Sequence, residues 1–93
     1  MPATLLLEER LALDGEAFVE LVVWQLDRPL VGCSHLFKYR LAYVVSGVCV
    51  VRYDNEAGKG DHRHVGRRER AYEFTSLEAL QTDFWVDVAR WKE

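Results

Sequence analysis

Alternation of apolar and polar residues is the feature that most constrains the fold of this chain. A period of two is typical of a strand with one buried face, because successive side chains of a strand point to opposite sides. Turn-forming pairs, Asp14–Gly15 and Ser46–Gly47, interrupt the alternating runs. We therefore predict two β-hairpins, with strands over residues 4–13, 17–26, 36–45 and 48–53.

The two turns also predict which residues face one another, because a two-residue loop fixes the register of a hairpin. One side of the first hairpin then forms a wall of the core, and the second hairpin is apolar on both faces near its turn. The predicted pairs are Leu5–Trp24, Leu7–Val22, Leu11–Phe18 and Glu9–Glu20 in the first hairpin, and Ala42–Val51, Val44–Cys49, Leu41–Arg52 and Tyr39–Asp54 in the second.

The final third of the chain changes from a period of two to a helical period. Thr75-Ser76-Leu77-Glu78 has the spacing of a capping box, which predicts a helix from about residue 76 to residue 91. Asp83 and Asp87 are interpreted as part of its solvated side. The apolar stripe consists of Leu77, Leu80, Phe84, Val88 and Trp91.

Residues 55–71 are rich in glycine and charge and are predicted to form a loop, with residues 72–74 as an optional short edge strand. The fold expected for the 93 residues is one α+β domain. It has an antiparallel meander sheet of four to five strands over residues 4–54, and the helix packs on one face. Because one helix covers only one face of a sheet, the second apolar face predicts a homodimer or another protein partner.

Charge is distributed unevenly along the chain. The 12 Lys and Arg residues stand against 15 Asp and Glu, a net charge of −3 that argues against a general nucleic-acid binder. Residues 59–70, however, hold five basic and two acidic residues. An anionic ligand is therefore expected at this segment, and a solvated loop without a specific role is the alternative.

The pair His62 and His64 in this segment has three interpretations. With Asp61 or Asp54 the imidazoles could bind Zn²⁺ or Mn²⁺, although further ligands at a suitable spacing are missing. As acid and base they could transfer protons in RNA cleavage without a metal. A structural histidine pair is the third interpretation. In the second interpretation the charge of the phosphorane is stabilised by Lys59, Arg63 or Arg52.

Other candidate groups are weaker. Glu9 and Glu20 could hold a metal but are explained as easily by a charge partner such as Arg40. His35 is interpreted as the residue that leads into the third strand. Cys33 and Cys49 are expected to be reduced thiols, because no secretory signal or membrane-spanning stretch is visible and a cytoplasmic location is expected.

Several strings of residues resemble the TumE-like family of toxins from bacterial toxin–antitoxin systems, over about residues 5–90. The most specific strings are Tyr53-Asp54-Asn55-Glu56 and Lys59-Gly60-Asp61-His62-Arg63-His64, preceded by Phe37-Lys38-Tyr39-Arg40 and followed by Tyr72-Glu73-Phe74 and Asp83-Phe84. The resemblance implies a small cytoplasmic toxin encoded beside a helix-turn-helix antitoxin that neutralises it.

The sequence thus predicts a toxin that cleaves RNA without a metal or cofactor. A non-catalytic binding module and a metal-dependent nuclease are the alternatives. The predicted catalytic residues are His62, His64, Asp54 and Arg52, and the predicted RNA-binding residues are Lys59, Arg63, Lys38, Arg40 and Tyr39.

Overall fold

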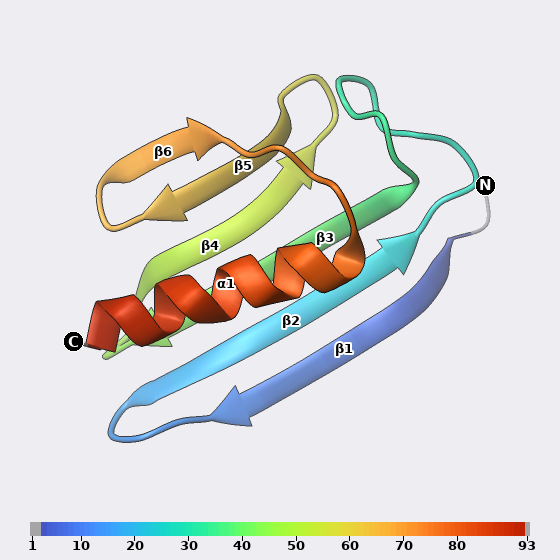
Figure 1. The fold of residues 1–93 in the computed structure, drawn as a ribbon. Helices are drawn as coiled ribbons and strands as arrows, with labels where there is room; N and C mark the ends of the chain where they lie inside the picture. The colour runs from blue at the N-terminus through green and yellow to red at the C-terminus, as the bar shows by residue number, and fades with distance from the viewer. Residues whose placement is uncertain (1–2, 93) are drawn as a thin grey trace.

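Six strands, each hydrogen-bonded to the next along the chain, form one antiparallel sheet in the computed structural model, which describes residues 3–92 (Figure 1). A C-terminal helix packs on one face of this sheet. The α+β class and the meander order are confirmed, and the number of strands exceeds the predicted four to five. The elements are β1 (Thr4–Ala12), β2 (Ala17–Gln25), β3 (Phe37–Val45), β4 (Val48–Glu56), β5 (Gly60–Val65), β6 (Arg68–Ala71) and α1 (Leu77–Lys92).

The prediction of a loop over residues 55–71 was wrong. This part of the chain contains the end of β4 and the whole β5–β6 hairpin, whose turn is made at Gly66 with a φ of 60°. Residues 72–74 follow β6 and are not a strand. Polar residues occupy both faces of β5 and β6, so the alternation of apolar and polar residues that reveals a strand is absent there.

Both predicted hairpin registers hold over only part of each hairpin. Leu5 does face Trp24, but a bulge between Leu5 and Leu7 and a longer loop shift the rest by one residue, so that Glu9 faces Leu21 and Glu20 faces Arg10. The predicted Glu9–Glu20 pair therefore does not form. The Ser46–Gly47 turn gives the predicted Val44–Cys49 pair, and a bulge beyond it shifts the pairing to Arg40–Asp54, Leu41–Tyr53 and Ala42–Arg52.

The core lies between α1 and the sheet. It is built from alternate residues of the three central strands and from the helix stripe, as the period of the sequence predicts. Ser76 begins the helix, because its Oγ accepts a hydrogen bond from the backbone N–H of Ala79 at 3.0 Å. The largest fully buried side chains here are Tyr39, Tyr53, Phe84, Leu41, Leu80, Val19, Val23, Val51 and Asn55.

The opposite face of the sheet, which we call the open face, is covered by no element within residues 3–92 (Figure 1). Phe18, Val22 and Trp24 of β2 lie on it, half-buried, while Val19, Leu21 and Val23 fill the core. The prediction thus assigned the wrong face of β2 to the core. The error arose because this strand has apolar residues on both faces. Homodimerisation through the open face stays a prediction that light scattering tests.

None of the helices in the described range, residues 3–92, combines the length and the apolarity that crossing a membrane requires.

Candidate functional site

Residues of three neighbouring strands form two polar rows on the open face. The register places Arg40 of β3, Asp54 of β4 and His62 of β5 directly beside one another, and it places Arg52 of β4 beside His64 of β5. Directly opposed side chains of antiparallel strands have Cβ atoms about 5 Å apart. All four residues predicted to be catalytic therefore lie together on one surface.

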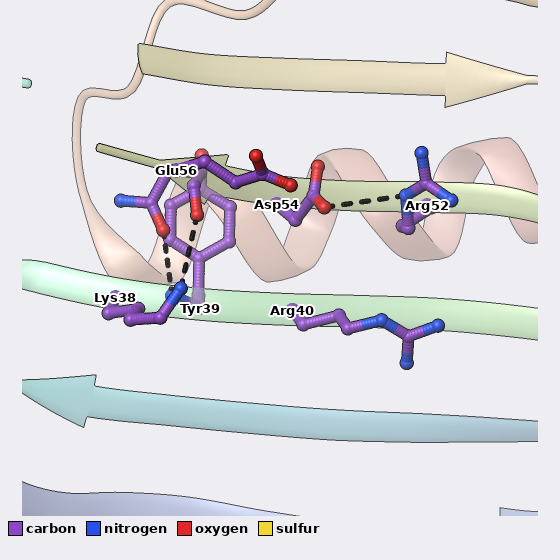
Figure 2. A pocket seen from close by; sticks show the side chains of 7 residues that line it. Lys38, Tyr39, Arg40, Arg52, Asp54 and Glu56 are labelled. Atoms are coloured by element: carbon purple, nitrogen blue, oxygen red, sulfur yellow. Dashed lines mark hydrogen bonds and ion pairs between the residues drawn. The ribbon is translucent and has the colours of Figure 1, made fainter. Parts of the chain in front are cut away.

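A depression of about 370 Å³ opens at the end of these rows (Figure 2). Arg52 Nε lies 3.4 Å from Asp54 Oδ2, and Lys38 Nζ lies 3.4 Å from the carbonyl oxygen of Asn55. Figure 2 shows Arg40 extending along the same surface, and this guanidinium makes no ion pair with any residue of the described range. The depression is lined by Lys38, Tyr39, Arg40, Arg52, Asp54, Asn55 and Glu56.

Three buried side-chain nitrogen atoms of the described residues have no hydrogen-bond partner, and all three belong to this surface. They are Nε of Arg52, Nδ1 of His62 and Nδ1 of His64. The Arg52–Asp54 pair is close enough to be an ion pair, but its Nε–H is not aligned as a hydrogen bond. Buried polar atoms are nearly always paired, so unpaired ones concentrated at one place call for an explanation.

The tautomer of His62 follows from its neighbour. Its Nε2 is 2.8 Å from the carbonyl oxygen of Lys59, which can only accept, so Nε2 carries the proton. In the neutral ring, Nδ1 then keeps a lone pair that can accept a proton. His62 is thus oriented by the turn between β4 and β5 in the form required of a general base.

An ion pair lies across the strand that carries His64. Arg52 and Glu69 flank His64 on the neighbouring strands, and Arg52 Nη2 is 3.8 Å from Glu69 Oε2. Since strands are about 4.8 Å apart, this pair spans two strand spacings, across the strand that carries His64. An anion that binds Arg52 in place of Glu69 would lie beside His64.

Of the other predicted site residues, Lys59 lies at the margin of this surface, because its partner Glu56 lines the depression, whereas the Tyr39 hydroxyl and Arg63 point to the helix side. Lys59 lies in the exposed turn and is 4.0 Å from Glu56. The hydroxyl of Tyr39 points to the helix side, where it donates to Asp61 Oδ1 at 2.7 Å. Arg63 also points to the helix side, because it alternates with His62 and His64 along β5.

Arg63 is held there by Asp87 of α1. Its Nε and Nη2 each lie 2.7 Å from one carboxylate oxygen of Asp87, which also accepts from the Tyr53 hydroxyl at 2.5 Å. Asp87 is only 4% exposed, so its interpretation as a solvated helix residue was wrong. Burial and the bond to Asp87 raise the pKa of Tyr53 well above its usual range.

The family of the chain follows from its match to a family model. The model described as Toxin TumE matches residues 2–92. The chain belongs to the TumE toxin family. Membership implies a toxin of a toxin–antitoxin module and therefore an antitoxin partner. No curated protein and no solved structure matches the chain.

The strings typical of the TumE family divide between the two faces. In Tyr53-Asp54-Asn55, only Asp54 points to the open face. Asn55 is 1% exposed and links the strand ends, accepting from the backbone N–H of Tyr39 at 3.0 Å and donating to the carbonyl oxygen of Phe37 at 2.7 Å. Tyr53 and Asn55 thus hold the fold, and Asp54 belongs to the candidate site.

A second polar cluster of this TumE chain lies on the helix side. The β2–β3 loop packs against the β4–β5 turn, where a Cβ on Gly60 would lie 3.0 Å from the carbonyl oxygen of Gly32. This contact brings Cys33 and His35 to Asp61, and one ligand atom from each lies within 4.8 Å of the others. Thiol, imidazole and carboxylate are ligand types that zinc uses.

Hydrogen bonds already occupy this cluster. His35 Nδ1 accepts from the backbone N–H of Phe37 at 3.1 Å, so Nε2 carries the proton and donates to Asp61 Oδ1 at 2.8 Å. Binding a metal at Nε2 would move the proton to Nδ1 and break the bond to Phe37. Burial and the carboxylate of Asp61 raise the pKa of Cys33, which favours the thiol. We therefore assign this cluster a structural role and not a metal-binding one.

Trp24 is a candidate residue that the sequence argument missed. The register places it directly beside Lys38 on the open face, and Val22 lies beside Arg40. An aromatic ring next to free cations is the arrangement that binds single-stranded nucleic acid. The sequence could have revealed this neighbourhood, because Trp24 and Lys38 lie opposite each other on paired strands. Finding it required assigning Trp24 to the open face of β2 and not to the core.

Proposed function

We propose that the protein is the toxin of a toxin–antitoxin module that cleaves RNA on the open face of its sheet, without a metal ion. The observation that supports this proposal most strongly is the group of three unpartnered nitrogens on Arg52, His62 and His64. An orphaned guanidinium N–H suits a phosphate oxygen, and orphaned imidazole nitrogens suit proton transfer. A structural polar cluster would have satisfied them internally.

The proposed reaction is transesterification within the RNA. Neutral His62 takes the proton of the ribose 2′-hydroxyl, and the 2′-oxygen forms a bond to phosphorus. The bond from phosphorus to the 5′-oxygen breaks, and protonated His64 gives its proton to that oxygen. The products are a 2′,3′-cyclic phosphate and a 5′-hydroxyl, and no other reactant is consumed.

The cations have the role of holding the phosphate. Arg52 lies beside His64 and Arg40 lies one strand from Asp54, so both reach a phosphate placed between the rows. Their charge stabilises the extra negative charge of the phosphorane. Asp54, directly beside His62, stabilises the imidazolium that forms when His62 accepts the proton. Lys38 and Lys59 extend the positive surface for the neighbouring phosphates, and Trp24 offers a ring for a base.

Purified protein incubated with RNA in excess EDTA tests the proposal. We expect cleavage that ends in cyclic phosphate, and we expect His62→Ala and His64→Ala each to reduce its rate by about 100-fold or more. Both variants should lose toxicity in cells and still bind the antitoxin. Cleavage that EDTA abolishes and Mn²⁺ or Zn²⁺ restores would instead assign His62, His64 and Asp54 to a metal site.

The matched control is Arg28→Ala, a change of an exposed cation in the β2–β3 loop. A non-catalytic binding module predicts a different pattern: RNA remains intact, and affinity falls in proportion to the charge removed, whether or not a histidine is changed. That result would overturn the proposed function.

A further inference from the structure

A second depression lies on the helix side of the β5–β6 hairpin, and the described residues that line it are Arg63, Val65, Arg68 and Arg70. Arg63 and Arg70 face each other directly in the register. Like charges in directly opposed positions destabilise a sheet. Asp87 neutralises Arg63, but within residues 3–92 neither Arg68 nor Arg70 has an ion-pair partner. Arg68 and Arg70 therefore give this side of the hairpin a positive charge that the described residues do not offset.

The end of the helix places an aromatic ring beside this positive surface. Trp91 of α1 lies against the hairpin turn, where a Cβ on Gly66 would be 3.3 Å from its ring. Trp91 is 42% exposed, so part of its ring remains open to solvent. An accessible indole against the hairpin that carries Arg68 and Arg70, which have no ion-pair partner among the described residues, matches the requirements of single-stranded nucleic acid, with phosphates for the cations and a base for the ring.

The two faces meet at the edge of the sheet. β6 is the outermost strand of the sheet (Figure 1). An RNA strand that passes around β6 would leave the face on which His62 and His64 lie and reach the face on which Arg68 and Arg70 lie. Neighbouring residues such as His64 and Val65 point to opposite faces of the same short hairpin.

We propose that Arg68, Arg70 and Trp91 form a second binding site, which holds the phosphates and a base of the RNA strand that flanks the cleavage site. This inference rests on the proposed function, because it takes RNA as the ligand. An acidic protein segment, such as part of an antitoxin, is the alternative occupant. The unpaired arginines together with the exposed ring favour RNA.

Binding of a fluorescent single-stranded oligonucleotide at several salt concentrations tests this site. The cleavage-deficient His62→Ala/His64→Ala protein serves as the background, so that the RNA stays intact. Adding Arg68→Ala/Arg70→Ala should weaken binding about tenfold or more at low salt. It should also reduce the slope of log affinity against log salt by about 0.7 for each phosphate that the protein no longer neutralises. Arg10→Ala/Arg28→Ala removes the same number of positive charges from β1 and the β2–β3 loop, outside the β5–β6 hairpin, and should leave the slope unchanged.

Cleavage by otherwise wild-type protein separates this inference from the proposed function. With Arg68→Ala/Arg70→Ala, the rate on a dinucleotide should be unchanged, while KM for a longer RNA should rise. Equal binding by the Arg68→Ala/Arg70→Ala and Arg10→Ala/Arg28→Ala proteins overturns the second site. The second site is also overturned if the Arg68→Ala/Arg70→Ala protein keeps its affinity for RNA but loses its affinity for the antitoxin. Full RNA binding without cleavage by the wild type leaves the second site standing and overturns the proposed chemistry.

Discussion

The two faces of strand β5 use similar polar residues in opposite ways. Asp61 and Arg63 point to the helix side, where each is held by short bonds to neighbours, at 2.8 Å to His35 and 2.7 Å to Asp87. His62 and His64 alternate with them and point to the open face, where each keeps an unpartnered Nδ1. The difference teaches that hydrogen-bond satisfaction, more than residue type, separates the groups that build this fold from those left for a ligand.

The energetic scale supports this distinction. A buried polar atom without a partner costs about 1–3 kcal/mol, and three such atoms are a substantial cost for a domain whose net stability is about 5–15 kcal/mol. A ligand that pairs with them recovers that cost when it binds. The contrast to be tested is between the helix side, where Asp61 and Arg63 are hydrogen-bonded, and the open face, where His62 and His64 each keep an unpartnered nitrogen.

Loss of Asp87 should have the largest effect on stability. Asp87→Ala leaves the partly exposed Arg63 and the buried Tyr53 hydroxyl without their partner, and losing hydrogen bonds to a charged group costs about 1.5–3 kcal/mol each. Chemical denaturation measures the change. Asp83→Ala is the control, because Asp83 is exposed and accepts one bond from Tyr72, and it should cost about 1 kcal/mol or less. Equal losses would contradict the special role of the helix-side network.

High pH should weaken the helix side next most strongly. Burial, and after it the bonds to Asp61 and Asp87, raise the pKa of Tyr39 and Tyr53 above the usual range. The folded protein therefore holds these protons where the unfolded chain releases them. Their contribution to stability is complete below about pH 10 and is lost above it, by about 1.4 kcal/mol per pH unit for each tyrosine.

Unfolding measured from pH 8 to pH 12 checks this slope. Tyrosinate absorbance from these two residues should appear only as the protein unfolds. Tyr39→Phe and Tyr53→Phe should each flatten the dependence, and a slope that neither substitution changes would contradict the assignment.

Removal of the Arg52–Glu69 ion pair should have a smaller effect, on activity. Glu69→Gln removes one of the two carboxylates beside Arg52 and leaves its Nη2 open to phosphate, and exposed pairs contribute about 0.2–1 kcal/mol. We therefore expect KM for RNA to fall by about 1.5- to 5-fold with little change in stability. Glu73→Gln, an exposed carboxylate beyond the hairpin, is the control. A rise in KM would show that Glu69 helps to bind RNA and does not compete with it.

The smallest expected effect concerns Cys33. Because burial and Asp61 raise the pKa of its thiol, alkylation of Cys33 at neutral pH should be slower than that of a free cysteine. Mass spectrometry of the labelled protein follows the reaction. Asp61→Asn should accelerate the labelling, and fast alkylation of the unchanged protein would contradict the hydrogen-bonded cluster.

The sequence predicted those parts of the molecule whose pattern is amphipathic. The two hairpins repeat apolar residues with a period of two and α1 repeats them at three- and four-residue intervals, so their positions could be inferred. β5 and β6 could not, because Asp61 and Arg63 are as polar as the histidines between them, and it is their partners that make the helix side stable. The partner of Arg63 is Asp87, 24 residues away on another element, which no local pattern reveals.

The candidate site was predicted in part. Its open-face members lie at the end of β4 and along β5, and the motif strings placed them close together. The bulge between Tyr43 and Val44 set which of them face one another, since it moved Arg40 and not Tyr39 opposite Asp54. A bulge of this kind depends on tertiary packing and left no recognisable signal in the sequence.

In the proposed account, the open face of the sheet cleaves RNA, and the hydrogen-bonded helix side stabilises the fold. Its most direct test measures RNA cleavage in EDTA together with the free energy of unfolding, for His62→Ala/His64→Ala and for Asp87→Ala. We predict that the histidine variant loses cleavage by at least about 100-fold while its stability falls by no more than about 1 kcal/mol, since the only side-chain hydrogen bond lost is that to Lys59 and two unpartnered nitrogens are removed. Asp87→Ala should lose stability and keep cleavage under conditions where it remains folded. A histidine variant that still cleaves RNA, or that unfolds as readily as Asp87→Ala, would contradict this account.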